Sequence, residues 1–319
     1  MFAYRTRVIW TSIFFFCLIL TSCGGPATPP TTISPTPTPS PQARSTATTS
    51  PSPTALPTPS TPPHYTARVL FRGQGRPDDL AFDPAGHLLF GDFYNGTISR
   101  INADGTITVI ARGLAGPEGL TALPNGTLII AEQRIHSIAS LAPGATIPTI
   151  LRRLPGTPST ARCKDGVDGT AYDPTTNTLI VPDSPTGDVY RMSMDGRTLT
   201  HLTSGMVRPV GAMVDQHGNI YVADECGGSV WRIAPSGATQ HFNGFAMPDD
   251  VALDSQGNLL VIDLAINVHA LIRLNLATGQ HEILASQGYI EPQGLAVDQH
   301  GNIFVSDDFA NMIVEYTPS

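Results

Sequence analysis

Hydrophobic positions recur along this chain in short blocks that are bounded by glycine, proline or aspartate. In the last block, an apolar segment at 295–297 leads into Asp298-Gln-His-Gly-Asn302, and a second apolar segment follows at 303–305. The Asp-x-x-Gly-Asn sequence is typical of a tight turn, because an Asp side chain can accept hydrogen bonds from nearby backbone N–H groups and Gly tolerates a positive φ. Short apolar strands around such turns predict antiparallel hairpins.

This block is repeated six times, and each copy opens with a related phrase. The copies begin at Pro77, Pro117, Val167, Pro209, Pro248 and Pro292, so the intervals are 40, 50, 42, 39 and 44 residues. A period near 40 with turns inside each unit is typical of stacked supersecondary units. Each copy continues into a third strand and a fourth strand that ends in glycine. The sequence therefore predicts an all-β fold, a six-bladed β-propeller of four-stranded antiparallel blades.

The two ends of the repeat predict how the ring closes. The sixth copy stops after its third strand, near Tyr316, whereas an additional strand at 67–73 precedes the first copy. We expect this N-terminal strand to pair with the last blade, because that pairing leaves no exposed sheet edge. Residues 64–319 are thus expected to form the propeller.

Residues 1–63 are expected to deliver and anchor the propeller. Arg5 and Arg7 precede a largely apolar run at 8–20, which is the layout of a secretory signal peptide and is short for a membrane span. The sequence Leu20-Thr21-Ser22-Cys23 resembles the bacterial lipobox. This resemblance implies a lipoprotein signal peptide at 1–22, lipidation of Cys23 and anchoring to a membrane of the bacterial cell envelope, facing outside the cytoplasm. An ordinary signal peptide with a chance cysteine is the alternative.

The segment after the signal peptide differs sharply in composition from the repeats. Residues 23–63 are mostly Pro, Thr and Ser, which predicts a disordered tether. Residues 1–63 contain three arginines and no acidic residue, so the propeller carries 15 basic and 26 acidic residues, a net charge of −11. Nucleic-acid binding requires clustered Lys and Arg, and Lys164 is the chain's single lysine, so this charge argues against nucleic acid as a partner.

Two cysteines lie within the repeats. Cys163 falls in the loop that leads into blade three, and Cys226 falls in the loop between the second and third strands of blade four. These loops open on the same face of neighbouring blades, and an extracytoplasmic protein meets an oxidising compartment. The sequence therefore predicts a Cys163–Cys226 disulfide, with two separate thiols as the alternative.

The second residue of the recurring phrase varies, so it is where a functional site is expected. The six residues are Asp78, Glu118, Asp168, Val210, Asp249 and Gln293. This position lies near the mouth of the central channel in propellers, where four converging carboxylates would repel one another. A bound cation is the usual remedy, and hard oxygen ligands favour Ca²⁺ or Mg²⁺. The alternative is that these acids are splayed apart, hydrated, or bonded to loop N–H groups.

A second acidic series closes the second strand of every copy. Its members are Asp92, Glu132, Asp183, Asp224, Asp263 and Asp307. Recurrence in all six copies indicates a structural role, in which the carboxylates bind loop N–H groups. The histidines form no evident cluster, and His136 and His269, the two nearest the expected mouth, are interpreted as loop or core residues. A zinc hydrolase or a serine triad is therefore unsupported.

Residues 66–316 resemble NHL repeats, most clearly in the units that begin at Pro209 and Pro292. Similar six-bladed architecture is found in the gluconolactonase and senescence-marker-protein superfamily and in non-catalytic NHL modules, and more distantly in streptogramin lyases. The gluconolactonase resemblance implies one divalent cation held at the mouth by Glu, Asn and Asp from separate blades. Asp249 matches the ligand Asp, whereas Asp78 and Asp168 stand where an Asn is expected.

Two functional hypotheses follow. The first is a lipid-anchored, metal-dependent hydrolase of a lactone or ester, with Asp78, Glu118, Asp168 and Asp249 as metal ligands and with its catalytic residues unassigned. The alternative is a non-catalytic NHL-type module that binds a protein, a peptide or a polymer across the face of the propeller that carries the mouth.

Overall fold

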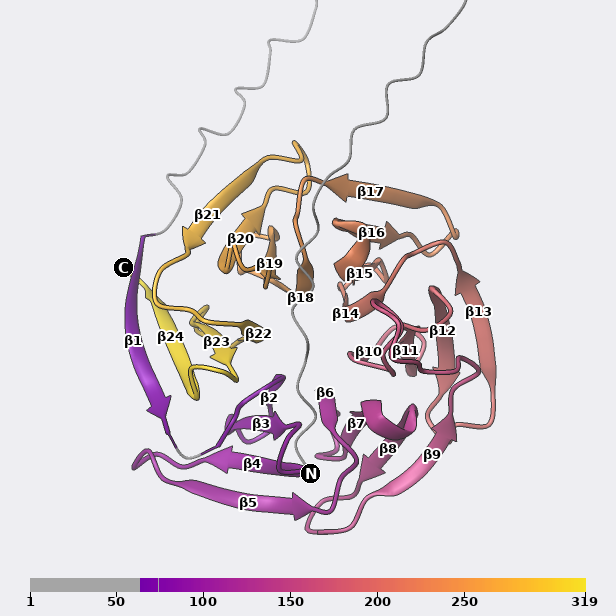
Figure 1. The fold of residues 1–319 in the computed structure, drawn as a ribbon, viewed down its shortest axis with the longest axis horizontal. Helices are drawn as coiled ribbons and strands as arrows, with labels where there is room; N and C mark the ends of the chain where they lie inside the picture. Colours follow the sequence, from indigo (N-terminus) through magenta and orange to yellow (C-terminus); the bar gives the residue numbers. More distant parts are fainter. Residues whose placement is uncertain (1–63, 74) are drawn as a thin grey trace, which may run out of the picture. The chain divides into compact units, whose positions relative to one another are not determined.

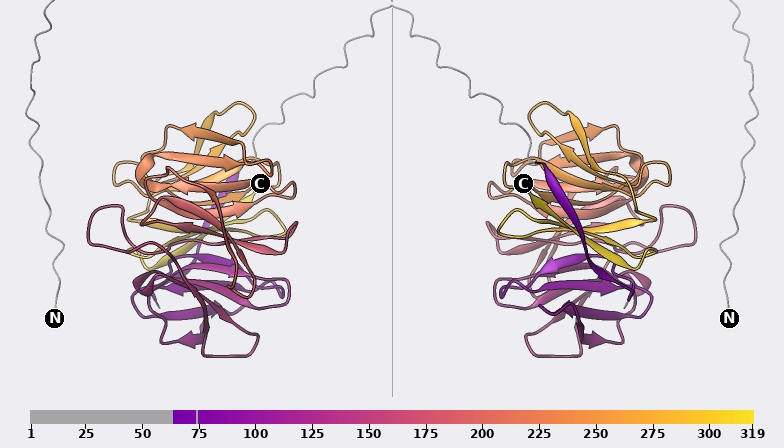
Figure 2. Two further views of the ribbon diagram at one scale, coloured as in Figure 1. Left: turned by 90° about the vertical axis from the view of Figure 1, so that its right-hand side faces the viewer. Right: turned by 90° about the vertical axis from the view of Figure 1, so that its left-hand side faces the viewer.

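The computed structural model describes residues 64–73 and 75–319, and these residues form a six-bladed β-propeller (Figure 1). The sequence predictions for the signal peptide, Cys23 and the tether lie outside the described residues. The six sheets fan around a common axis in Figure 1, and the side views show that the strands of neighbouring sheets overlap in a flattened disc (Figure 2). The described part of the chain contains no helix that is long and apolar enough to cross a membrane.

Each blade is an antiparallel sheet of four strands, as the sequence predicted. Blade 1 contains β2 (Leu80–Phe82), β3 (Leu88–Asp92), β4 (Thr97–Ile101) and β5 (Ile107–Arg112). Blade 2 contains β6 (Pro117–Ala122), β7 (Leu128–Glu132), β8 (Ser137–Leu141) and β9 (Thr149–Arg153). Blade 3 contains β10 (Ala171–Asp173), β11 (Thr178–Asp183), β12 (Asp188–Ser193) and β13 (Leu199–Thr203).

The remaining blades repeat this order, and two short 3₁₀ helices interrupt their loops. Blade 4 contains β14 (Pro209–Val214), β15 (Ile220–Asp224), β16 (Ser229–Ile233) and β17 (Thr239–Asn243). Blade 5 contains β18 (Pro248–Leu253), β19 (Leu259–Asp263), β20 (Ala270–Leu274) and β21 (His281–Ala285). Blade 6 contains β22 (Pro292–Val297), β23 (Ile303–Asp307) and β24 (Met312–Pro318). The 3₁₀ helices are η1 (Gln133–Ile135) and η2 (Glu225–Gly227).

The N-terminal strand closes the ring, which confirms the predicted closure. β1 (Tyr65–Arg72) pairs antiparallel with β24, so the sheet order in blade 6 is β1-β24-β23-β22. Beside this joint, the Arg76 guanidinium bonds the Asp308 carboxylate at 3.0 Å and lies 3.5 Å from the centre of the Tyr94 ring. The joint between the two chain ends is therefore held by backbone pairing and by side chains from blades 1 and 6.

The hydrophobic core lies between neighbouring blades. Every residue of the second strand is buried in five of the six blades (β3, β7, β15, β19 and β23), whereas the fourth strands alternate or lie exposed. One core cluster joins Val222 of blade 4 to Ile180 and Val189 of blade 3. The continuous apolar segments seen in the sequence thus reflect packing against neighbouring blades on both faces of each second strand.

The second acidic series binds loop N–H groups, in agreement with its predicted structural role. Asp224 Oδ1 accepts hydrogen bonds from the N–H groups of Val207 and Arg208, each at 2.9 Å. Asp307 Oδ2 accepts the N–H of Ile290 at 2.6 Å in the same way. These carboxylates fix the loops that lead into the first strands, and those loops carry the mouth of the channel.

Candidate metal centre at the channel mouth

The backbones of neighbouring blades meet closely at the mouth of the central channel. The third residue of the recurring phrase is glycine in four blades, at Gly119, Gly169, Gly211 and Gly294. A Cβ at Gly119 would lie 2.2 Å from the carbonyl oxygen of Asp168, and one at Gly294 would lie 2.4 Å from that of Asp78. Glycine is therefore required there because the next blade's backbone occupies the space of a side chain.

Asp79 and Asp250 replace this glycine in blades 1 and 5, and sequence reasoning did not single them out. Asp79 Oδ2 accepts the N–H of Leu120 at 2.6 Å, and Asp250 Oδ2 accepts the N–H of Leu295 at 2.8 Å. Each carboxylate thus ties its blade to the next one. Burial raises the pKa of both carboxyls, and that of Asp250 rises to about 7. The sequence feature that could have identified Asp79 and Asp250 is a carboxylate at a position that is glycine in the other four copies.

The four predicted metal ligands line one cavity at the mouth. Asp78, Glu118, Asp168 and Asp249, called the mouth cluster below, lie there with Gln293, whereas Val210 is fully buried in the core. The cavity has a volume of about 10 Å³, close to the least that holds one water molecule. A single small ion or a water fits among these carboxylates, and an organic substrate does not.

Asp78 and Asp249 are the members of the mouth cluster without a hydrogen-bond donor. Both residues are buried, with exposed fractions of 9 % and 7 %, and their carboxylates accept no hydrogen bond from any described residue. A buried carboxylate that lacks a donor is costly when it is ionised. These two side chains can therefore be stabilised by a proton, by a water in the cavity or by a cation.

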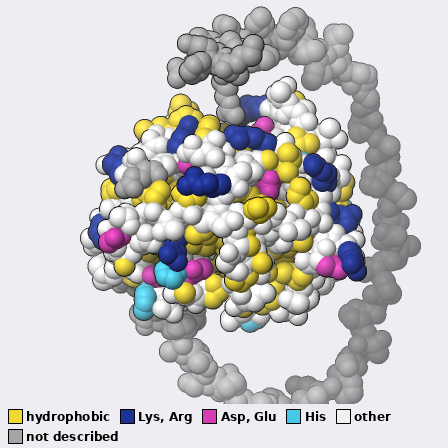
Figure 3. All heavy atoms as spheres, turned by 90° about the horizontal axis from the view of Figure 1, so that it is seen from below, with side chains coloured by type: hydrophobic (Ala, Val, Ile, Leu, Met, Phe, Trp, Pro, Cys, Tyr) yellow, Lys and Arg dark blue, Asp and Glu magenta, His cyan; other side chains and the backbone are white. Residues whose placement is uncertain are grey.

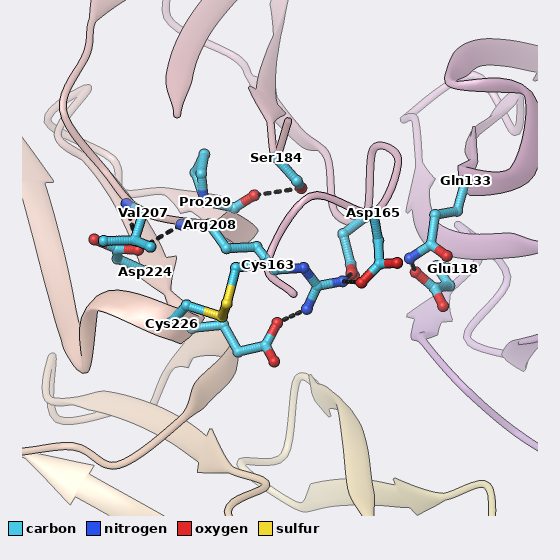
Figure 4. A network of polar contacts seen from close by, with 12 residues as sticks. Glu118, Gln133, Cys163, Asp165, Ser184, Val207, Arg208, Pro209, Asp224 and Cys226 are labelled. Carbon is cyan, nitrogen blue, oxygen red and sulfur yellow. Dashed lines mark hydrogen bonds and ion pairs between the residues drawn. A yellow bond between two sulfur atoms is a disulfide. The ribbon is translucent and has the colours of Figure 1, made fainter. Parts of the chain in front are cut away.

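Glu118, by contrast, is held by a side chain of its own blade (Figure 4), and Asp168 is held by a side chain of the next blade. Gln133 Nε2, in η1, donates a hydrogen bond to Glu118 Oε2. Arg208 Nη2 donates to Asp168 Oδ2 at 2.8 Å. Burial raises the pKa of the Glu118 carboxyl, and the nearby Asp168 also raises it.

Arg208 is the basic residue of the mouth, and sequence reasoning missed it. Its Nη1 pairs with Glu225 of η2, its Nη2 lies 3.9 Å from Asp165, and its side chain is 10 % exposed. The guanidinium lies between the disulfide and Asp165 (Figure 4). The sequence did hold a signal for Arg208: it stands directly before the proline of the fourth copy, as Arg76 stands before Pro77.

Charge repulsion and burial together shift the acid–base behaviour of the mouth cluster. Burial raises the pKa of Asp78, Glu118 and Asp249 well above the usual carboxyl range, and the neighbouring charge of Asp168 raises all three further. Arg208 opposes this by lowering the pKa of Glu118 and Asp249. The cluster therefore holds more negative groups than its one guanidinium can balance.

A disulfide joins Cys163 and Cys226, with their Cα atoms 6.1 Å apart. It connects the loop before Asp165 and Asp168 to η2, which carries the Glu225 partner of Arg208. The disulfide therefore links the two chain segments that position Arg208's carboxylate partners.

The mouth cluster is not a preformed metal site. No group of three or more His, Cys, Asp or Glu in the described ranges is already arranged to hold a metal ion. The mouth cluster nevertheless suits a hard cation, because it places carboxylate oxygens around a space of ionic size. Two of these carboxylates, those of Asp78 and Asp249, accept no hydrogen bond from a described residue. The side chains would have to close further around one ion.

The two histidines nearest the mouth do not contribute to it. His136 is buried, and its Nδ1 accepts the N–H of Val167 at 2.9 Å while its Nε2 lies 3.3 Å from Asp183 Oδ1. His136 thus fixes the backbone just before Asp168. His269 lies in the loop between β19 and β20 and donates its backbone N–H to Ala265.

Comparisons with known proteins identify the fold. No family model and no curated protein matches the chain. One solved structure that matches is a catalytically inactive virginiamycin B lyase from Staphylococcus aureus with quinupristin. The TM-score is 0.60, and the sequences are 19 % identical over 77 % of this chain and 82 % of that chain. A gluconolactonase from Xanthomonas campestris matches with a TM-score of 0.64 and 16 % identity over 80 % and 90 %.

A third match extends this likeness to a different kind of protein. A chain of the nidogen/laminin complex matches with a TM-score of 0.62 and 20 % identity over 72 % of this chain and 88 % of that chain. An enzyme that acts on a lactone, a lyase and a member of a protein complex therefore share this architecture. The chain is similar in fold to gluconolactonase-like and streptogramin B lyase propellers, and the six-bladed propeller is what the comparisons establish.

Proposed function

We propose that the mouth cluster binds one divalent cation, Ca²⁺ or Mg²⁺, and that the chain hydrolyses a lactone or an ester there. The observation that carries this proposal is the pair of buried carboxylates, Asp78 and Asp249, that face a cavity of ionic size without any donor. Glu118 and Asp168 would complete the ligand set. Likeness in fold to a gluconolactonase supports the choice of substrate class.

The chemistry of the chain's own residues suits this reaction. A cation held at the mouth would polarise the substrate carbonyl. A carboxyl of the mouth that is outside the proposed ligand set, such as Asp250 with its pKa raised by burial to about 7, can take the proton of the attacking water and return it to the leaving alkoxide oxygen. The Arg208–Asp168 pair keeps the ligand Asp168 in place.

Equilibrium dialysis followed by elemental analysis tests whether the mouth binds a cation. The wild type, Asp249→Asn and Asp298→Asn are compared. Asp298 is the matched control, because its carboxylate accepts the N–H groups of His300 and Asn302 in a turn at the opposite end of the blade. We expect about one equivalent of Ca²⁺ or Mg²⁺ in the wild type and in the control, and a loss of roughly tenfold or more in affinity for Asp249→Asn. A wild type without bound cation would refute the proposal.

A second candidate function is a binding module without catalysis, and the rim of the mouth favours it. Five exposed apolar residues lie on loops of this face, namely Tyr94, Val207, Ile266, Ile290 and Phe309. An apolar rim around a narrow acidic centre is typical of an interaction surface for a protein, a peptide or a polymer. Bound cation without turnover on a panel of lactones and esters would favour this second function.

Membrane anchoring is a separate part of the proposal. We propose that Cys23 is lipidated and holds the propeller in the bacterial cell envelope, on the side away from the cytoplasm. Mass spectrometry of the mature protein is expected to find an N-terminal peptide that begins at Cys23 and carries acyl chains. An unmodified mature N-terminus, or membrane association that survives Cys23→Ser, would contradict this.

A further inference from the structure

We propose that a second cavity, between blades 1 and 2 on the face opposite the mouth, binds a small organic carboxylate with an apolar body. This cavity has a volume of about 650 Å³, which lies within the range of small-molecule sites. Its apolar wall includes Pro84, Leu89, Val109, Pro124, Leu141 and Pro143. Arg100 and Asp83 line the same cavity, and the Asp83 carboxylate is engaged by Ala85 and His87 of its own turn, so the guanidinium is the group available to a ligand.

Arg100 occupies a repeated position at which other blades have a paired arginine. It is the fourth residue of β4, and Arg191, Arg232 and Arg273 are the fourth residues of β12, β16 and β20. Arg273 Nε donates to Asp254 at 3.0 Å and Arg232 Nη2 donates to Asn219 at 2.8 Å. Arg191 pairs with Asp173 in the same manner. In these blades the partner therefore comes from the turn between the first two strands.

Arg100 has no such partner among the described residues. Its guanidinium donates no hydrogen bond to them, and its Nε is buried. The turn aspartate of blade 1, Asp83, binds His87 instead, with Oδ2 2.9 Å from His87 Nδ1. Its Oδ1 accepts the N–H groups of Ala85 and His87, each at 2.9 Å. The Asp83 carboxylate is thus engaged within its own turn.

His87 is a departure from the repeat, which makes this arrangement specific to blade 1. The equivalent position, five residues before the acid that closes the second strand, is Thr178 in blade 3 and Asn219, Asn258 and Asn302 in blades 4 to 6. Thr178 Oγ1 accepts from Arg191 and Asn219 Oδ1 accepts from Arg232, each at 2.8 Å. In blade 5, Asn258 leaves the turn aspartate able to accept from Arg273 as well. His87 offers Arg100 no side-chain oxygen, so Arg100 lacks the acceptor that Thr178 and Asn219 provide in blades 3 and 4.

These features define the ligand class by its chemistry. A guanidinium with unused donors binds a carboxylate through two parallel hydrogen bonds, and apolar walls favour a hydrocarbon body over a sugar or a nucleotide. Hydrophobic side chains also gather between charged ones on the side of the propeller that carries blades 1 and 2 (Figure 3). A monocarboxylate with a chain or ring of several carbons satisfies both requirements.

Isothermal titration calorimetry of octanoate into the purified full-length chain tests this proposal. Octan-1-ol, which keeps the body but lacks the charge, and acetate, which keeps the charge but lacks the body, are expected to bind at least tenfold more weakly. Arg100→Gln is expected to weaken octanoate binding about tenfold or more. Arg191→Gln, the matched control in blade 3, is expected to leave it unchanged, because Arg191 does not line this cavity.

A second variant makes the test independent of any folding defect in Arg100→Gln. His87→Asn supplies the side-chain oxygen that Asn219 offers to Arg232 in blade 4, so Arg100 gains an acceptor and octanoate binding is expected to weaken with Arg100 still present. Ser140 occupies the arginine position in blade 2, so a neutral residue is compatible with the blade. Absence of octanoate binding by the wild type, equal binding by Arg100→Gln, or equal binding of octan-1-ol would overturn the proposal.

Discussion

The charge balance of the mouth can be tested through its single described guanidinium, that of Arg208. Replacing Arg208 by Gln removes the partner of Asp168 at 2.8 Å and the partner of Glu225, and it leaves both carboxylates largely buried. Loss of one partner from a buried ion pair costs about 3–5 kcal/mol. We therefore expect Arg208→Gln to lower the free energy of unfolding by about 3–5 kcal/mol at pH 7.5 in the absence of divalent cations.

The size of this loss is expected to depend on pH. The folded-state pKa values of Glu118 and Asp249 are raised, so the stability that their protonated forms contribute is present at low pH and is lost as the pH rises through those values. Arg208 lowers both pKa values, and its removal raises them further. The deficit of Arg208→Gln should therefore be smaller at pH 5 than at pH 7.5, and an added divalent cation should reduce it at pH 7.5.

Urea unfolding followed by circular dichroism, in EDTA and in CaCl₂, measures these differences. Arg273→Gln is the matched control, because Arg273 is also a buried arginine that pairs with Asp254 and Glu282, but it lies in the outer part of blade 5. This control should lose stability similarly in EDTA and in CaCl₂. A deficit for Arg208→Gln that is equal at both pH values and insensitive to the cation would refute the proposed charge balance.

Two further predictions concern the scaffold of the mouth. Gly119→Ala places a Cβ 2.2 Å from the Asp168 carbonyl oxygen. We therefore expect the free energy of unfolding, measured in urea, to fall by about 1–3 kcal/mol, and cation binding, measured by dialysis, to weaken. Unchanged values in both measurements would contradict the close contact. The double variant Cys163→Ser, Cys226→Ser opens a loop of 63 residues, which should cost about 4 kcal/mol in urea unfolding, and a loss below about 1 kcal/mol would contradict this.

Most of the fold could be predicted from the sequence because a propeller blade is built from local hairpins. The turn at Asp298–Asn302 and the strands on both sides of it are neighbours in the chain, so their pairing follows from turn chemistry and from the short apolar segments that flank the turn. Closure is the long-range feature, and counting strands at the two ends was sufficient to predict it. The bounds of the closing strand were less accurate, since 67–73 was expected and Tyr65–Arg72 is observed.

The candidate site was predicted less completely because its contacts cross from blade to blade. The variable second position located Asp78, Glu118, Asp168 and Asp249, and the structure places them in one cavity. Arg208 escaped notice because its partners come from loops distant in the sequence.

The same limit applied to the third position of the phrase. Asp79 and Asp250 escaped notice because a carboxylate in a repeat looks like an ordinary turn residue until its acceptor geometry is known. In the structure each one accepts an N–H from the next blade. Residue type and spacing were therefore sufficient to predict the acidic residues of the mouth, whereas the hydrogen-bond partners of these residues could be identified only from the structure.

The narrowness of the mouth decides where specificity must lie. Glycine at the third position of four blades brings neighbouring backbones into contact, and the remaining cavity holds an ion or a water. Any organic ligand must therefore contact the loops above it, where Ile266 is 85 % exposed and Phe309 is 47 % exposed. These loops lie outside the repeated strands and differ in sequence from blade to blade. A propeller of this kind can thus change its ligand through the rim while the acids of the mouth and the blades stay the same.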